Sequence, residues 1–327
     1  MEEGPRSRLF ALPWLVLPGL LLLAAVAIGL SLSCGSTGCG VAPDSILALR
    51  LARTLAAFVT GALLSLAGAL MQVLLRNPLA DPYVLGISGG AAVGALLCLA
   101  LFPALAWAVQ AGALGGALVS LLLLLLLASR AAFGGPQQRA GQGGVRLILT
   151  GVMLAAAFGA VLSLLLALAP DRALRGVFFW LLGDLESSRS QLLGWLALGL
   201  CLAWSLVAAG RLNVLAHGEH TAWLLGIRVQ RLRLMTLLVA SAATAAAVSV
   251  AGTIGFIGLV VPHALRLLLG NDQRLLLPAV VLGGGGVLVL ADLLARTVVA
   301  PVQLPVGVIT ALAGVPVFLW LLSRGRG

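Results

Sequence analysis

The 327-residue sequence contains no lysine, so all 20 of its basic residues are arginine. A phosphate-binding P-loop of the pattern GxxxxGK[ST] requires a lysine. The chain therefore holds no such loop and cannot hydrolyse ATP through one. Charged residues of both signs make up only 9% of the chain. Soluble domains carry about 25%, so this composition excludes an ordinary soluble protein.

Acidic residues are equally scarce, and none lies at the centre of an apolar run. The ten fall in loops or near the ends of such runs: Glu2, Glu3, Asp44, Asp81, Asp171, Asp184, Glu186, Glu219, Asp272 and Asp292. A proton-coupled carrier typically needs a carboxylate or histidine within the membrane as a relay. The sequence offers no clear relay, so a pump built on it is expected to take its energy from a partner.

Apolar residues dominate, at 61% of the chain with a mean hydropathy of +1.15. A helix needs about 20 mostly apolar residues to cross a bilayer. Ten runs approach that length: Leu12–Leu32, Leu51–Leu75, Val84–Leu101, Ala106–Ala128, Val145–Leu168, Leu192–Ala209, Leu234–Ala251, Ile254–Leu269, Leu275–Leu294 and Val306–Leu322. They predict an all-α polytopic membrane protein, with ten transmembrane helices in one domain over residues 1–327. The shorter run Leu174–Leu182 predicts a re-entrant or interfacial helix.

The arginines predict the orientation. With a short cytoplasmic N-terminus, residues 1–11, fourteen arginines fall inside and six outside, as the positive-inside rule expects. The six are Arg50, Arg53, Arg172, Arg175, Arg189 and Arg296. An even number of spans then places both termini in the cytoplasm. Membrane topology accounts for the net charge of +10, so no nucleic-acid partner is expected.

The four cysteines divide into two pairs. Cys98 and Cys201 lie in apolar runs and are expected to be small core residues. Cys34 and Cys39 share the first predicted outer loop, where an oxidising compartment would permit a disulfide. Both the disulfide and two free thiols stay open. We expect no metal site in this loop, because it offers too few ligands.

A polar stretch, Arg76-Asn77-Pro78-Leu79-Ala80-Asp81-Pro82, separates two long apolar runs. Each proline lacks a backbone N–H and disfavours helix in the residue before it. Lipid cannot replace the hydrogen bonds lost at such a break. We therefore expect protein or water to cover the stretch, which in a transporter places it near a pathway or gate.

The inner loop at about 212–233 is too polar to span and is patterned. Glu219, Ala222, Trp223 and Gly226 fit a short helix that ends at a glycine. Arg228, Arg231 and Arg233 then fit a second, basic turn. Two short helices at the cytoplasmic face would form a docking knob, and a solvated amphipathic loop is the alternative. His217 and His220 lie three apart, but two ligands do not make a zinc site.

On the predicted outer face, Arg50 and Arg53 lie one turn apart at the start of the second span. Arg296 ends the ninth span, with Asp292 at i−4 as a possible ion-pair partner. Each arginine could simply anchor the end of a span. Alternatively, the three form a basic patch that receives carboxylates, which arginine binds with two-pronged geometry.

These motifs, taken in order, resemble the FecCD-type permeases. The matching stretches are Arg50-Leu-Ala-Arg53-Thr54, Gly68-Ala-Leu-Met-Gln72, Asn77-Pro-Leu-Ala-Asp-Pro82, Leu85-Gly86, Phe179-Trp-Leu-Leu-Gly183, Leu212-Asn-Val-Leu with Gly218-Glu219, Gly255 to His263 with Arg266, Ala291-Asp292 with Arg296, and Leu304-Pro-Val-Gly307 through Pro316. Members of that family are membrane subunits of bacterial ABC importers for iron–siderophore complexes, haem and cobalamin.

The resemblance implies a type II ABC importer permease in the bacterial inner membrane. It implies a homodimer with two ATP-binding cassette subunits below and a periplasmic or lipid-anchored substrate-binding protein above. ATP and magnesium would be bound by the ATPase partner, and this chain would hold no cofactor. The residues that match the family's functional positions are Arg50, Arg53 and Arg296 for binding-protein docking, His217, Gly218, Glu219, Ala222 and Gly226 for ATPase coupling, and Asn77, Pro78, Leu79 and the short turn Gly143-Gly144 for the cytoplasmic gate.

The resemblance thus implies a permease that carries an iron(III) chelate or haem and is not itself an enzyme. Cobalamin is the alternative substrate within the same family. A stand-alone secondary carrier is the alternative of another class. A membrane-embedded enzyme is disfavoured because the chain shows no catalytic constellation.

Overall fold

The computed structural model describes residues 13–36, 38–40, 43–102, 105, 107–132, 142–169, 171–185 and 191–324. Its elements are α1 (Pro13–Ser33), β1 (Cys34–Gly35), β2 (Gly38–Cys39), α2 (Asp44–Leu75), the 3-10 helix η2 (Pro82–Leu85), α3 (Ile87–Leu101), α4 (Ala108–Ala132), α5 (Gln142–Leu168), α6 (Asp171–Leu181), α7 (Leu192–Ala216), α8 (Glu219–Leu224), α9 (Val229–Ala251), α10 (Ile257–Leu269), α11 (Gln273–Thr297) and α12 (Val306–Arg324). The all-α prediction is confirmed.

Seven helices are long and apolar enough to cross a membrane: α1, α2, α4, α5, α7, α9 and α11. Three shorter apolar helices, α3, α10 and α12, coincide with the third, eighth and tenth predicted spans. The 11-residue α6 forms where a re-entrant or interfacial helix was predicted. The total of ten spans stays a prediction.

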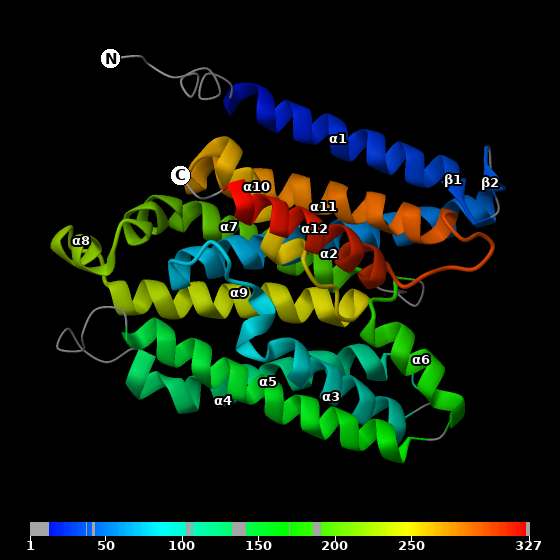
Figure 1. Ribbon diagram of the computed structural model, residues 1–327, viewed down its shortest axis with the longest axis horizontal. Coiled ribbons are helices and arrows are strands. Elements are labelled where there is room, and N and C mark those ends of the chain that lie inside the picture. Colours follow the sequence, from blue (N-terminus) through cyan, green and yellow to red (C-terminus); the bar gives the residue numbers. More distant parts are fainter. Residues whose placement is uncertain are drawn as a thin grey trace.

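The core is built around α2, α9 and α11. Most residues along these three helices are buried, and α2 packs against α11, α9, α10 and α7. In Figure 1, α1 flanks one side of this core, and α3, α4 and α5 form a group on the other side. The helix α8 projects at one end, called here the α8 end, and the β1–β2 hairpin marks the opposite, hairpin end. The start of α1 and the end of α12 both lie at the α8 end (Figure 1).

Small residues allow the core helices to approach closely. A Cβ atom at Gly68 of α2 would lie 1.7 Å from the carbonyl oxygen of Gly258 in α10. That carbonyl would normally bond to the N–H of residue 262, but Pro262 has none. Since lipid supplies no hydrophobic force between helices, such close backbone packing stabilises the bundle.

The polar break after α2 folds back against the core. Arg76 closes α2 in the left-handed conformation, with φ 49°. Asp81 then caps η2, because its carboxylate accepts a hydrogen bond from the N–H of Tyr83 at 2.7 Å. Pro82 is buried against Gly258 of α10. The later half of the break is therefore covered by protein, as the sequence led us to expect.

Two local predictions were wrong in the same region. The helix α7 continues to Ala216, so the inner loop is shorter than 212–233. No glycine or proline interrupts residues 211–216, and the helix stops only at His217-Gly218. The basic stretch Arg228–Arg233 is not a separate short helix either. Arg228 caps α9 and the rest forms the first turns of that helix, because nothing breaks the chain before the seventh span.

The predicted turn at Gly143-Gly144 was also wrong. Both residues lie in the first turn of α5, which begins at Gln142. Glycine costs little there, because the first N–H groups of a helix have no partner within it. The surroundings of these two glycines lie outside the described part of the chain.

Candidate functional site

The short helix α8 stands on a loop whose shape requires glycine. Gly218 precedes it with φ 133° and ψ 149°, a region that is essentially restricted to glycine. Gly226 follows it with φ 75°. There the N–H of Ile227 bonds to the carbonyl of Ala222 at 3.0 Å, and the N–H of Gly226 to that of Trp223 at 2.9 Å. This pair of bonds is the Schellman motif that ends helices, so both ends of α8 are fixed.

The end of α8 exposes large apolar side chains. Trp223, Leu224 and Leu225 are 60%, 65% and 65% exposed, whereas Ala222 on the inward face is fully buried. The His220 ring stacks on Trp223 with centroids 6.2 Å apart. A group of large exposed apolar side chains at the tip of a loop is typical of a surface that docks into another protein.

The carboxylate of Glu219, at the start of α8, pairs with two arginines. Its Oε1 lies 3.0 Å from Nη1 of Arg233 in α9 and 3.4 Å from Nη2 of Arg76 at the end of α2. The Arg233 side chain is buried. One carboxylate thus connects α8 to two core helices. From the sequence we expected a role for Glu219 but not for Arg76, and we expected Arg233 only as part of a basic turn.

A second set of polar contacts surrounds Asn213, near the end of α7 and close in sequence to α8. Asn213 on α7 donates from Nδ2 to the Asp272 carboxylate at 2.7 Å and accepts from the N–H of Gln273 at 2.7 Å. Its own carbonyl lies 2.8 Å from Nδ1 of His217. The amide of Asn213 holds the pKa of Asp272 below its usual range. These contacts hold the end of α7, which leads into α8, against the start of α11.

At the hairpin end, Arg50 points inward. Its guanidinium donates to the carbonyls of Leu32, Ser33 and Gly38, at 3.0, 2.9 and 3.2 Å. These carbonyls belong to the end of α1 and to the hairpin, which is closed by a disulfide between Cys34 and Cys39. The two outer cysteines, whose state the sequence left open, are therefore joined in a disulfide, and Arg50 holds the loop that contains this disulfide.

Arg53 and Arg296 meet on one carboxylate. Asp292 is fully buried, and its Oδ1 and Oδ2 lie 2.9 Å from Nε of Arg53 and 3.0 Å from Nε of Arg296. The predicted i−4 ion pair is confirmed. Arg296 also donates to the hydroxyl of Ser31 at 2.6 Å. The three predicted docking arginines do lie together at this end, but all three guanidinium groups are largely engaged within the chain.

The predicted gate residues lie at the α8 end. Asn77, Pro78 and Leu79 are exposed directly after α2. The side-chain oxygen of Asn77 accepts from the N–H of Leu79 at 2.9 Å, which forms a tight local turn. The proline and this turn hold the exposed tip in one shape, next to the ion pair between Arg76 and Glu219.

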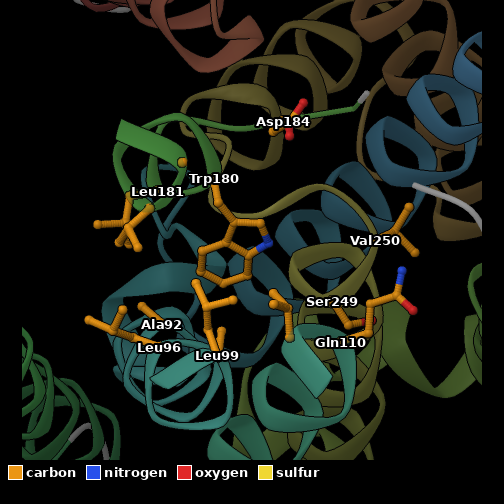
Figure 2. A pocket seen from close by; sticks show the side chains of 13 residues that line it. Ala92, Leu96, Leu99, Gln110, Trp180, Leu181, Asp184, Ser249 and Val250 are labelled. Atoms are coloured by element: carbon orange, nitrogen blue, oxygen red, sulfur yellow. The ribbon is translucent and has the colours of Figure 1, made fainter. Parts of the chain in front are cut away.

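A cavity of about 290 Å³ lies between α3, α4, α6 and α9. Figure 2 shows the indole of Trp180 in the midst of the lining residues, with Leu96 and Leu99 on one side and Gln110 and Ser249 on another. The lining is mostly apolar. The cavity is slightly smaller than typical ligand pockets of about 300–1,000 Å³, so it is too small by itself for a large metal chelate.

The fold and these two ends define a polytopic helical membrane protein with a short, exposed apolar helix, α8, at one end. The profile of the FecCD transport family matches residues 14–324. The chain belongs to this family, so the resemblance drawn from its motifs is confirmed, and it is an ABC importer permease.

Several characterised and uncharacterised relatives are similar over most of the chain. It is 43% identical over 286 residues to an uncharacterised ABC transporter permease, YvrB, of Bacillus subtilis, covering 84% of this chain and 78% of that protein. It is 41% identical over 287 residues to the hemin permease HmuU of Yersinia pestis, covering 85% and 83%. It is 40% identical over 282 residues to the vitamin B12 permease BtuC of Vibrio cholerae, covering 85% and 82%.

Solved structures give the same fold. An inward-facing, metal-chelate-type ABC transporter superposes with a TM-score of 0.84 at 30% identity, over 94% of this chain and 99% of that one. The PsaBC transporter of Streptococcus pneumoniae superposes with a TM-score of 0.59 at 18% identity, over 84% and 90%, which supports the fold alone.

Proposed function

We propose that this permease works as a homodimer in a bacterial inner membrane, with both termini in the cytoplasm. Two ATPase subunits dock at the α8 end, and a substrate-binding protein delivers cargo at the hairpin end. The chain itself binds no cofactor, and ATP and magnesium stay on the ATPase. The small single-chain cavity supports a pathway formed between two copies.

The observation that carries this proposal is the construction of α8. A surface helix with three large exposed apolar residues is costly unless a partner covers it. Its two terminal glycines and the ion pairs of Glu219 hold it rigidly on the bundle. A rigid apolar tip suits a docking element that transmits force, whereas a solvated loop would need neither feature.

For the cargo we propose an iron(III) chelate or haem, with cobalamin as the alternative. The support is the range of relatives, because one is a hemin permease and another a vitamin B12 permease, at nearly equal identity. Both ligands are large organic metal complexes. The lining residues named for the cavity include one charged side chain, Asp184, and a single carboxylate does not favour either ligand.

For the individual residues, we propose that Asn77, Pro78 and Leu79 close the pathway at the α8 end against the second subunit, with Gly143 and Gly144 nearby at the start of α5. At the hairpin end, we propose that the arginines attract the binding protein through their charge rather than by direct contact. Arg53 and Arg296 share the single carboxylate of Asp292, so these pairs leave a net positive charge, close to Arg50, that attracts carboxylates of a binding protein at longer range.

The test is uptake into proteoliposomes that contain the permease with or without its ATPase subunits, with ATP inside. Hemin, a ferric siderophore and cobalamin are offered separately, each with its loaded binding protein. We expect uptake of one of them only when the ATPase and ATP are present. Uptake by the permease alone would instead show a secondary carrier, and the proposal would be wrong.

A further inference from the structure

One oxygen atom at the start of α8 contacts two core helices at once. Oε1 of Glu219 lies 3.0 Å from Nη1 of Arg233 and 3.4 Å from Nη2 of Arg76. Arg233 belongs to α9, whereas Arg76 is the C-cap residue of α2 and is followed directly by Asn77, Pro78 and Leu79. The coupling helix is therefore linked through one carboxylate to the segment proposed as the gate.

The two ion pairs differ in strength. Arg233 is buried, and a buried guanidinium that lost its carboxylate would be strongly destabilising. The side chains of Arg76 and Glu219 are 35% and 29% exposed, and an ion pair of that exposure is weak. Glu219 is thus held firmly to α9 and only loosely to the end of α2, so the second contact can break and re-form.

Arg76 also occupies a position that does not favour arginine. Its φ of 49° lies in the left-handed region, where a helix normally ends with glycine or asparagine. Backbone geometry alone therefore gives no reason for an arginine here. Its side chain does form an ion pair with Glu219, so the reason for an arginine here lies in that contact and not in the shape of the turn.

We propose that Arg76 is a positioning residue that transmits movement of α8 to the gate segment. The inference rests on the proposed function. When the ATPase displaces α8, the Glu219–Arg233 pair makes α8 and the first turns of α9 move together. The Arg76–Glu219 contact then pulls or releases the end of α2, and with it the turn at Asn77–Leu79. Breaking this contact leaves ATP hydrolysis intact but separates it from the gate.

The test uses the complete transporter in proteoliposomes with the substrate that the wild type carries. Arg76→Gly removes the side chain but suits φ 49°, so the turn is not strained. Arg76→Lys keeps the positive charge. Arg211→Gln is the matched control, because it removes an exposed arginine of α7 at the same end of the molecule. Uptake per ATP hydrolysed is measured for each, together with the thermal unfolding midpoint.

Gate movement is measured in the same variants. Leu79→Cys is introduced with Cys98→Ser and Cys201→Ser, and cross-linking between the two subunits is compared with and without ATP. For Arg76→Gly we expect uptake per ATP to fall by about two- to five-fold, the scale of a partly exposed ion pair, and the response of cross-linking to nucleotide to shrink. Arg76→Lys keeps most of both, and Arg211→Gln behaves as the wild type.

Three results would overturn the proposal. The first is wild-type uptake per ATP in Arg76→Gly. The second is a response of cross-linking to nucleotide in Arg76→Gly that equals that of the wild type. The third is an equal loss in Arg76→Gly and Arg76→Lys, because then the positive charge would not matter. Each leaves the proposed function intact, since that depends on the wild type alone. Conversely, ATP-independent uptake by the wild type would refute the proposed function before any variant is measured.

Discussion

The Nε atom of Arg53 on α2 lies 2.9 Å from Oδ1 of Asp292 on α11, although 239 positions separate them in the chain. The same fully buried carboxylate receives Arg296 at 3.0 Å. A single negative charge therefore compensates two guanidinium groups where two central helices meet. Because the carboxylate has no access to water, its contribution depends on both arginines staying in place.

Asp292→Asn is expected to destabilise the protein by about 3–5 kcal/mol, because it leaves two largely buried cations without a counter-charge. The measurement is the thermal unfolding midpoint in detergent, monitored as the fraction of protein that stays folded after heating. Asp44→Asn at the exposed start of α2 serves as the control. Equal midpoints for the two variants would show that the buried pairs add no stability.

Arg50→Gln is expected to destabilise the hairpin end. The guanidinium satisfies the carbonyls of Leu32, Ser33 and Gly38, and glutamine is too short to reach all three. Hydrogen bonds to charged groups contribute about 1.5–3 kcal/mol each, so a loss of at least that size should appear in the free energy of unfolding. A variant that kept wild-type stability and lost only binding-protein affinity would instead support a direct docking role for Arg50.

Gly218→Ala is expected to weaken assembly with the ATPase. A side chain at φ 133° costs about 1–3 kcal/mol, and the strain is relieved by tilting α8. The measurement is the affinity of purified permease for its ATPase subunit. Gly199→Ala, in the middle of α7 with open space around it, is the matched control. If both variants bind the ATPase equally well, the shape of the loop does not matter for docking.

Stability is expected to depend on the charge of Asp272. Its pKa is lowered in the folded protein, mainly by the Asn213 amide. The ionised carboxylate therefore stabilises the fold above its unfolded pKa of about 3.9, and this contribution is lost as pH falls through the lower folded value. The unfolding midpoint of the wild type should exceed that of Asp272→Asn at about pH 6, and the difference should shrink below about pH 4. A constant difference across that range would contradict the assignment.

Much of the fold followed from the sequence because lipid imposes a simple rule. An apolar run of sufficient length must form a helix to satisfy its own backbone, so most of the predicted runs appear as helices with shifted ends. The ends moved where local breakers were weak. Nothing between Arg211 and Ala216 stops α7, and two glycines at 143 and 144 did not prevent α5 from starting before them.

The functional site was predicted less completely. Gly218, Glu219 and Gly226 could be assigned because helix starts and ends leave local signals. The partners of Glu219 could not, because Arg76 is 143 positions away and Arg233 fourteen. Arg50 carried the right charge for docking, but only the packed structure shows its guanidinium turned toward the end of α1.

The sequence by itself determined that this is a multi-span helical membrane protein without a P-loop, because length, apolar content and the absence of lysine are properties of the chain alone. Only the tertiary structure decided which of these charges are compensated by ion pairs within the chain. Ion pairs such as Arg53–Asp292 and Arg76–Glu219 form between residues that are distant in sequence, and their geometry is set by the packing of α2 against α11 and of α8 against the bundle. Charge is local to a residue, but compensation depends on what the fold places beside it.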